Sequence, residues 1–222
     1  RVRDYRVWAL SQMGNVSMFT NSDLDCDAIQ SFGADHIALA TGAHWTRHLY
    51  SALEIPITPL NKPQVFTPDE VFAGKVTGDR LLVFDFDHYY LGGVIAEHLA
   101  NSGKQVTYAT PAGHASAWTF MTNELPFVYQ ALARAGVAIH TTTNLISFEG
   151  TQATVANLFN QTTLELAVDG VVIVGHREPN DVLYDKLINN TESSGTVSPV
   201  SLVGDAQAPG AIVHAVHSGH TF

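Results

Sequence analysis

The chain has 222 residues, the length of one large domain or two small ones. Hydrophobic residues make up 45% of it, enough for a buried core, which excludes a disordered chain. The 11 Lys and Arg against 21 Asp and Glu give a net charge of −10, which disfavours nucleic acid as a partner. No apolar run reaches the ~18 residues of a membrane span, and no signal peptide begins the sequence, so we expect a cytoplasmic protein without a membrane partner.

Cys26 is the single cysteine, so an internal disulfide is excluded and the chain cannot supply the cysteines of an iron–sulfur cluster. The sequence begins at Arg1 inside a helical pattern and without an initiator Met. It ends at Phe222, again within a helical pattern and without a capping Gly or Pro. We therefore expect a piece of a longer polypeptide.

In the first part of the chain, the spacing of apolar and turn residues predicts short helices and strands. The helices are expected at residues 5–13, 23–32 and 68–74, and the strands at residues 16–20 and 36–40. The segment from His44 to Pro68 is rich in proline, which interrupts both kinds of element, so we expect a connection there.

The rest of the chain alternates strands with helices. Buried strands are expected at residues 81–84, 105–109, 137–139 and 171–174, helices at residues 91–101 and 125–135, and an antiparallel meander at residues 145–148, 153–158 and 163–167. The last part is expected to contain helices at residues 181–188 and 210–219, a polar loop at residues 189–198 and a strand at residues 200–203. This alternation with short connections predicts an α/β fold with parallel sheets.

The turn after the strand at residues 81–84 lies where a dinucleotide-binding unit carries Gly-x-Gly-x-x-Gly. Asp85, Asp87 and Tyr90 hold the three glycine positions, and their side chains would block and repel a pyrophosphate. No acidic residue lies between residues 98 and 123 to bind the ribose, and no Arg lies there to bind a 2′-phosphate. The sequence thus predicts the topology of a nucleotide site without the chemistry for NAD(P).

Two other strand ends suggest a nucleotide site. Gly204-Asp205 follows the strand at residues 200–203 and precedes a helix, so its N–H groups and carboxylate could lie beside a nucleotide. The alternative is an ordinary strand-to-helix turn with a helix-capping Asp. Thr41-Gly42, which follows another buried strand, strengthens the nucleotide interpretation.

Together these segments resemble the nested, Rossmann-like nucleotide domains of flavoprotein disulfide reductases, of the FAD/NAD(P)-binding type. The chain is most similar to the C-terminal half of the trimethylamine dehydrogenase and histamine dehydrogenase group, old-yellow-enzyme-like flavoenzymes. The segments that carry this resemblance are FGADH at residues 32–36, DHYYLGG at 87–93 and REPNDVLY at 177–184. It covers nearly the whole chain and implies parallel central sheets with an antiparallel meander.

The resemblance also implies a division into domains. Residues 1–45 and 176–222 would form the distal part of a first, truncated nucleotide domain, and residues 46–175 a second, NAD-domain-like unit with a degenerate fingerprint. In the family the first domain holds ADP or an FAD-like nucleotide as a structural group. Thr41 and Gly42 match the central turn of that site, and Gly204 and Asp205 match its distal motif. Because the first glycine motif would lie upstream of Arg1, we expect weak or no nucleotide binding.

The family divides its chemistry between parts of a longer protein. An amine is oxidised at FMN in a barrel, and electrons pass through a 4Fe-4S cluster to an electron-transfer flavoprotein. The barrel and the cluster cysteines are not in this chain. We therefore expect a C-terminal fragment of an amine dehydrogenase, an oxidoreductase, with a structural and partner-docking role and no catalysis of its own. Its partners would be the missing barrel, the acceptor flavoprotein and, through exposed apolar faces, a second copy.

Trp118 lies where relatives carry an aromatic residue used to dock the acceptor flavoprotein, so the resemblance implies partner docking. Core packing is the alternative, and we favour it because large aromatic side chains are usually buried. An exposed Trp118 beside Tyr89 and Tyr90 would reverse this preference, because aromatic residues anchor interfaces.

No catalytic or metal-binding residue is predicted. His214, His217 and His220 are spaced so that the third points away from the first two on a helix. Asp85 and Asp87 are expected to be solvated or to cap a helix. Cys26 lies between two aspartates, whose negative charges disfavour a thiolate, so we expect the thiol to be a poor nucleophile.

Two other functions remain open. The chain could be the NAD(P)H-binding domain of a dienoyl-CoA-reductase-like flavin oxidoreductase, although the lost glycines disfavour it. It could also be a stand-alone binding module without a parent barrel.

Overall fold

A five-stranded parallel sheet dominates the middle of the chain in the computed structural model, which describes residues 2–49, 60, 62–194 and 198–222. Its strands, in spatial order, are β3 (Val65–Phe66), β10 (Gly170–Val174), β4 (Arg80–Asp85), β5 (Gln105–Ala109) and β6 (Ala138–His140). The central strands are apolar because both faces of the sheet are covered, β10 along its whole length and β4 from Leu81 to Phe84.

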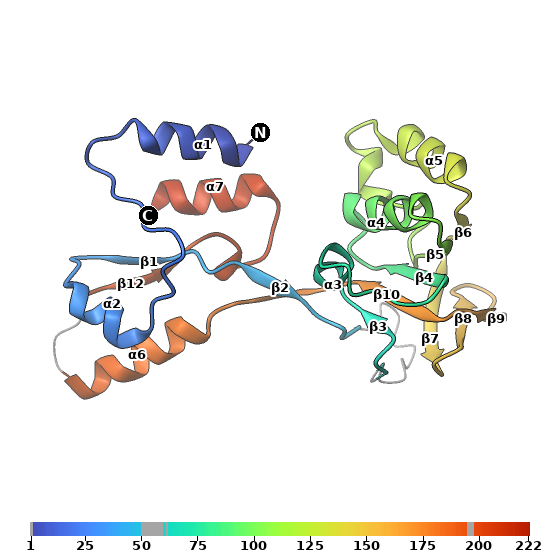
Figure 1. The fold of residues 1–222 in the computed structure, drawn as a ribbon. Helices are drawn as coiled ribbons and strands as arrows, with labels where there is room; N and C mark the ends of the chain where they lie inside the picture. The colour runs from blue at the N-terminus through green and yellow to red at the C-terminus, as the bar shows by residue number, and fades with distance from the viewer. Residues whose placement is uncertain (1, 50–59, 61, 195–197) are drawn as a thin grey trace.

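Alternate residues of β4 point to two different cores. Leu81 and Val83 pack with helices α4 (Tyr90–Asn101) and α5 (Leu125–Arg134) on one face of the sheet. Leu82 and Phe84 pack on the other face, against the meander of β7 (Thr143–Phe148), β8 (Gln152–Asn157) and β9 (Thr163–Ala167). Figure 1 shows the two helices and the meander on opposite sides of the sheet. The antiparallel pairing of the meander confirms the prediction.

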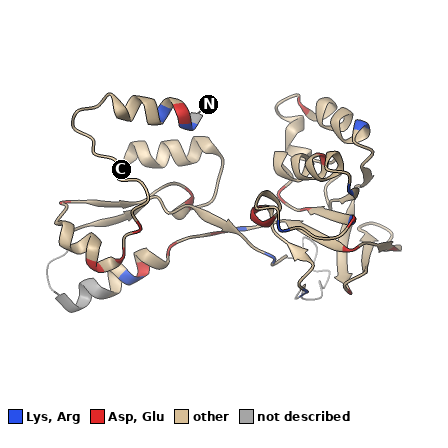
Figure 2. Ribbon diagram, in the orientation of Figure 1, with Lys and Arg blue, Asp and Glu red and all other residues tan. Residues whose placement is uncertain are grey.

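A second group of elements surrounds a short parallel pair, β1 (Ile37–Leu39) and β12 (Val200–Leu202). Helices α1 (Val2–Ser11) and α7 (Ile212–Thr221) lie on one side of the pair, and α2 (Cys26–Phe32) and α6 (Val182–Ser194) on the other (Figure 1). Helix α7 carries no Lys, Arg, Asp or Glu (Figure 2). The antiparallel strands β2 (Ala43–Trp45) and β11 (Arg177–Pro179) connect the two groups.

Local signals place several helix ends. Asp25 is the N-cap of α2 and accepts the Ala28 N–H at 2.9 Å, and Gly33 ends that helix with φ +69°. Helix α3 (Pro68–Phe72) begins with Pro at its first position and a capping box between Thr67 and Glu70. Both signals are readable in the sequence, and both helices agree with the prediction.

The predicted strand at residues 16–20 is wrong. Those residues are irregular and their apolar side chains are exposed, and no strand in the described part of the chain pairs with them. A strand requires a hydrogen-bonded neighbour, and alternation in the sequence does not supply one.

Two other expectations are corrected. The expected connection at residues 44–68 contains most of β2, all of β3 and the start of α3, whereas residues 50–59 and 61 lie outside the described residues. The expected loop at residues 189–198 is helical up to Ser194, because no Gly or Pro interrupts α6 before Gly195, and residues 195–197 are not described. None of the described helices is long and apolar enough to cross a membrane.

The parallel five-stranded sheet, the parallel β1–β12 pair and the antiparallel meander confirm the predicted α/β fold class. The 3-10 turns η1 (Ala117–Phe120) and η2 (Gly204–Ala206) lie at the residues singled out for partner docking and for nucleotide binding.

Candidate functional site

The four residues predicted to bind a nucleotide follow the carboxyl ends of neighbouring strands. Leu39 of β1 is in register with Leu202 of β12, and the Val203 N–H donates to the Leu39 carbonyl at 3.0 Å. Thr41-Gly42 and Gly204-Asp205 therefore leave the parallel pair at the same end, where α/β proteins bind ligands. Gly42 and Gly204 have φ of +76° and +64°, a backbone conformation that favours glycine.

The polar groups of these residues are already bonded within the chain. The Thr41 hydroxyl donates to the Asn180 carbonyl at 2.5 Å, and the Gly204 N–H donates to Ser218 Oγ at 3.0 Å. Asp205 accepts from Arg177 Nη1 at 2.7 Å and from the Gly210 N–H at 3.0 Å. The Thr41 hydroxyl, the Gly204 N–H and the Arg177 guanidinium, three groups that could bind a diphosphate, are therefore engaged within the chain.

In the sequence, Arg177 is notable only as the first residue of the segment REPNDVLY. Besides Asp205, it donates to the Gly210 carbonyl at 3.0 Å, and its guanidinium lies 5.3 Å from the centre of the Trp45 ring. Arg177 lies on β11 and Trp45 on β2, so these contacts fix the two connecting strands onto the turn η2. The alternative interpretation of Asp205 as a helix cap is not observed, because α7 begins after Ala211.

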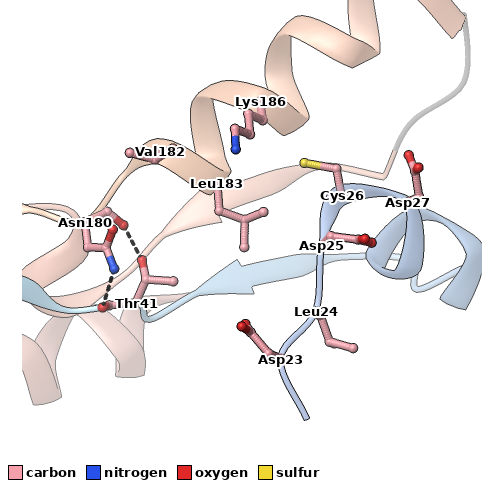
Figure 3. A pocket seen from close by; sticks show the side chains of 10 residues that line it. All are labelled: Asp23, Leu24, Asp25, Cys26, Asp27, Thr41, Asn180, Val182, Leu183 and Lys186. Carbon is pink, nitrogen blue, oxygen red and sulfur yellow. Dashed lines mark hydrogen bonds between the residues drawn. The ribbon is translucent and has the colours of Figure 1, made fainter.

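A cavity of about 650 Å³ opens between α2 and α6 (Figure 3). Thr41 lines it together with Lys186 and the carboxylates of Asp23, Asp25 and Asp27. Three carboxylates against one ammonium group would repel the phosphates of ADP. Cys26 also lies in the wall of the cavity and is a free cysteine. The cavity therefore offers no second candidate for the nucleotide site.

Asp85 is the last residue of β4 and is fully buried. Its Oδ1 accepts the N–H groups of Asp87 at 3.2 Å and His88 at 3.1 Å, and its Oδ2 accepts the hydroxyl of Tyr108 on β5. Burial raises the pKa of Asp85 to about 7, against the lowering effect of these hydrogen bonds. The expectation of a solvated or helix-capping Asp85 is therefore wrong.

The buried carboxylate occupies the turn that a dinucleotide would use. The N–H groups at the strand-to-helix turn, which would donate to a pyrophosphate, donate to Asp85 instead. Gly92 in the first turn of α4 is so close that a Cβ there would lie 2.5 Å from Asp85 Cγ. The carboxylate of Asp85 and the close packing of Gly92 against it therefore both disfavour NAD(P) binding at this turn.

Trp118 is exposed, with 56% of its surface accessible, so the favoured core packing is wrong. Phe120 and Met121 next to it are 64% and 73% exposed. The Trp118 N–H donates to the His88 carbonyl at 2.8 Å. Tyr89 follows His88, and the centre of its ring lies 4.3 Å from that of the tilted Tyr90 ring. Residues 115–122, called the Trp118 segment below, thus lie beside the tyrosines that begin α4.

The three histidines of α7 are exposed, and His214 Nδ1 accepts the Ala211 N–H. Within the described part of the chain, no group of three or more His, Cys, Asp or Glu is arranged to hold a metal ion.

Residues 66–171 match the family model described as the OYE-like second alpha/beta domain. Over 248 aligned residues the chain is 26% identical to dimethylamine dehydrogenase from Hyphomicrobium sp. (strain x), covering 98% of this chain and 33% of that protein.

Solved structures show the same relationship. The 6-hydroxypseudooxynicotine amine oxidase from Pseudomonas geniculata N1 is 34% identical with a TM-score of 0.93, over 99% of this chain and 33% of that one. Histamine dehydrogenase from Rhizobium sp. 4-9 is 31% identical with a TM-score of 0.90, over 99% of this chain and 35% of that one. The chain thus spans about a third of the length of these relatives. Taken with the matched domain, these likenesses support a relationship of the chain to a C-terminal part of the trimethylamine dehydrogenase and histamine dehydrogenase group.

Proposed function

We propose that this chain is the structural and partner-docking part of a cytoplasmic, flavin-dependent amine dehydrogenase. Relatives named as dimethylamine dehydrogenase, histamine dehydrogenase and an amine oxidase support amine oxidation as the activity of the whole protein. The FMN and the 4Fe-4S cluster would belong to the parts of the parent that this chain does not contain. The chain itself would not carry out the oxidation, and its partners would be the barrel of the parent and an electron-transfer flavoprotein.

The exposure of Trp118 is the observation that carries the docking role. Trp118, Phe120 and Met121 present three large apolar side chains at the surface within four residues of the chain. Such side chains are usually withdrawn from water unless a partner covers them, and tryptophan is among the residues that most often dominate binding energy at interfaces. An acceptor flavoprotein that collects electrons from the parent enzyme would bind here.

The nucleotide role of the first domain is a weaker proposal. Thr41, Gly42, Gly204 and Asp205 lie at one end of the β1–β12 pair, as a nucleotide turn would, but the Thr41 hydroxyl, the Gly204 N–H and the Asp205 carboxylate are bonded within the chain. We propose that this chain alone binds ADP or an FAD-like nucleotide weakly or not at all. The alternative of an NAD(P)H-binding domain is disfavoured by the buried carboxylate of Asp85.

The docking proposal is tested by Trp118→Ala in the full-length parent enzyme. Truncating an exposed anchor is expected to lower the rate of electron transfer to an electron-transfer flavoprotein at least tenfold, because an interface hot spot is worth ~2 kcal/mol or more. The rate with a small dye acceptor should stay unchanged, since a dye needs no docking surface.

Phe32→Ala is the matched control, because Phe32 is an exposed aromatic residue on α2, in the group of elements around the β1–β12 pair and outside the Trp118 segment. It should change neither rate. Equal rates with the protein acceptor for wild type and Trp118→Ala would refute the docking role.

A further inference from the structure

Backbone N–H groups of the Trp118 segment donate to three different elements around it. The donors are Ala115, to Tyr129 Oη on α5 at 3.2 Å; Ser116, to Tyr108 Oη on β5 at 3.0 Å; and Trp118, to the carbonyl of His88 before α4 at 2.8 Å. Ser116 itself has φ of +48°, an unfavourable conformation for a residue with a side chain. The segment is therefore held by its neighbours and not only by its own 3-10 turn.

A single buried carboxylate connects two of these three contacts. Tyr108, which accepts from Ser116, donates its hydroxyl proton to Asp85. His88, which accepts from Trp118 through its carbonyl, donates its own N–H to Asp85 at 3.1 Å. Asp85 thus bonds at the same time to the phenol and to the turn on which the Trp118 segment rests.

We propose that Asp85 is a positioning residue for partner docking, which sets the place of the Trp118 segment through Tyr108 and His88. This inference rests on the proposed docking function of Trp118. It also gives a role to the carboxylate that stands at the first glycine position of the degenerate fingerprint. The strand-to-helix turn is used here to hold a surface segment instead of a pyrophosphate.

Burial makes this network effective. Asp85, Tyr108 and Ser116 are all fully buried, so water cannot replace a hydrogen bond that is removed. Gly92 of α4 closes over the carboxylate with no room for a side chain, which limits Asp85 to one position. A displaced Tyr108 hydroxyl would leave the Ser116 N–H and Oδ2 of Asp85 without the bonds that Tyr108 makes to them.

The direct test is amide hydrogen exchange of this 222-residue chain in the Tyr108→Phe variant. Exchange at Ser116 and Trp118 is expected to become about tenfold faster, the effect of losing one buried hydrogen bond. Tyr184→Phe on α6 is the matched control and should leave both amides unchanged. Acrylamide quenching of Trp118, measured with Trp8 and Trp45 both replaced by Phe, should increase in Tyr108→Phe for the same reason.

The amide of Val172, in the centre of the sheet, separates a local from a global effect. If Val172 exchange also becomes faster in Tyr108→Phe, the Asp85→Asn variant decides, because Asn keeps the size of the side chain. Faster exchange at Ser116 and Trp118 in Asp85→Asn, with Val172 unchanged, supports the proposal. Unchanged exchange at Ser116 and Trp118 in either variant overturns it.

The positioning role of Asp85 and the docking role of Trp118 can be refuted independently. If Asp85→Asn loosens the segment while Trp118→Ala leaves the rate with the protein acceptor unchanged, the docking function fails and Asp85 still positions the segment. If Trp118→Ala lowers that rate and Tyr108→Phe leaves the exchange unchanged, docking stands and positioning by Asp85 is refuted.

Discussion

Replacing Gly92 by alanine tests how tightly α4 closes over Asp85. The added Cβ would lie 2.5 Å from Asp85 Cγ, 2.7 Å from its Cβ and 2.8 Å from its Oδ1. Carbon atoms prefer separations of roughly 3.5–4.0 Å, so the overlap is about 1 Å and either the helix or the carboxylate must move. Either movement would disturb the bonds of Asp85 to the turn.

The expected change in the free energy of unfolding combines two destabilising effects with one stabilising effect. Overpacking a buried site costs about 1–3 kcal/mol, and weakening a hydrogen bond to a charged group costs about 1.5–3 kcal/mol more. Alanine in a helix gains roughly 1 kcal/mol over glycine. We expect Gly92→Ala to lower the free energy of unfolding by about 2–4 kcal/mol, measured by urea denaturation followed by circular dichroism.

Two controls isolate the contact with Asp85. Gly219→Ala places a Cβ in open space on α7 and should leave stability unchanged or slightly raised. In an Asp85→Gly background, Gly92→Ala should cease to destabilise, because the group it meets has gone. A stable Gly92→Ala variant, or the same loss of stability in both backgrounds, would refute the close packing inferred here.

Two further predictions concern pH and ligands. Since the pKa of Asp85 is about 7 in the folded chain, against an ordinary value of 3.8, the folded state binds the extra proton, and this group's contribution to stability falls as pH rises from about 4 to 7. Burial lowers the pKa values of His88 and His176, so their contributions to stability rise with pH instead. The fall is therefore expected in the difference in free energy of unfolding between wild type and Asp85→Asn, measured as a function of pH. In calorimetric titrations we expect no binding of NADH and weak or no binding of ADP, and an NADH complex would contradict the role assigned to the Asp85 turn.

Several parts of the fold could be predicted from the sequence because their causes are local. The apolar runs of β4 and β10, the Asp25 cap of α2 and the Pro68 start of α3 each depend on residues within a few positions. The alternating segments of the meander pair with their nearest neighbours in the chain, so short connections settle their order.

Pairing between distant segments could not be predicted in the same way. Strand β2 pairs with β11, where Trp45 faces Arg177 across more than half the chain. Residues 16–20 have a strand-like pattern but no such partner among the described residues. Whether a short extended segment becomes a strand depends on a neighbour that the local sequence does not contain.

The amino-acid sequence is enough to show that the strand-to-helix turn after β4 lacks the chemistry of a dinucleotide site, because Asp85, Asp87 and Tyr90 stand at the three glycine positions. What the turn does instead depends on the tertiary fold. The environment of Asp85 is made by Tyr108 from β5 and Gly92 from α4, and the exposure of Trp118 depends on which elements cover it. Burial and hydrogen bonding are properties of segments brought together by the fold, so the same aspartate and tryptophan have different roles in different surroundings.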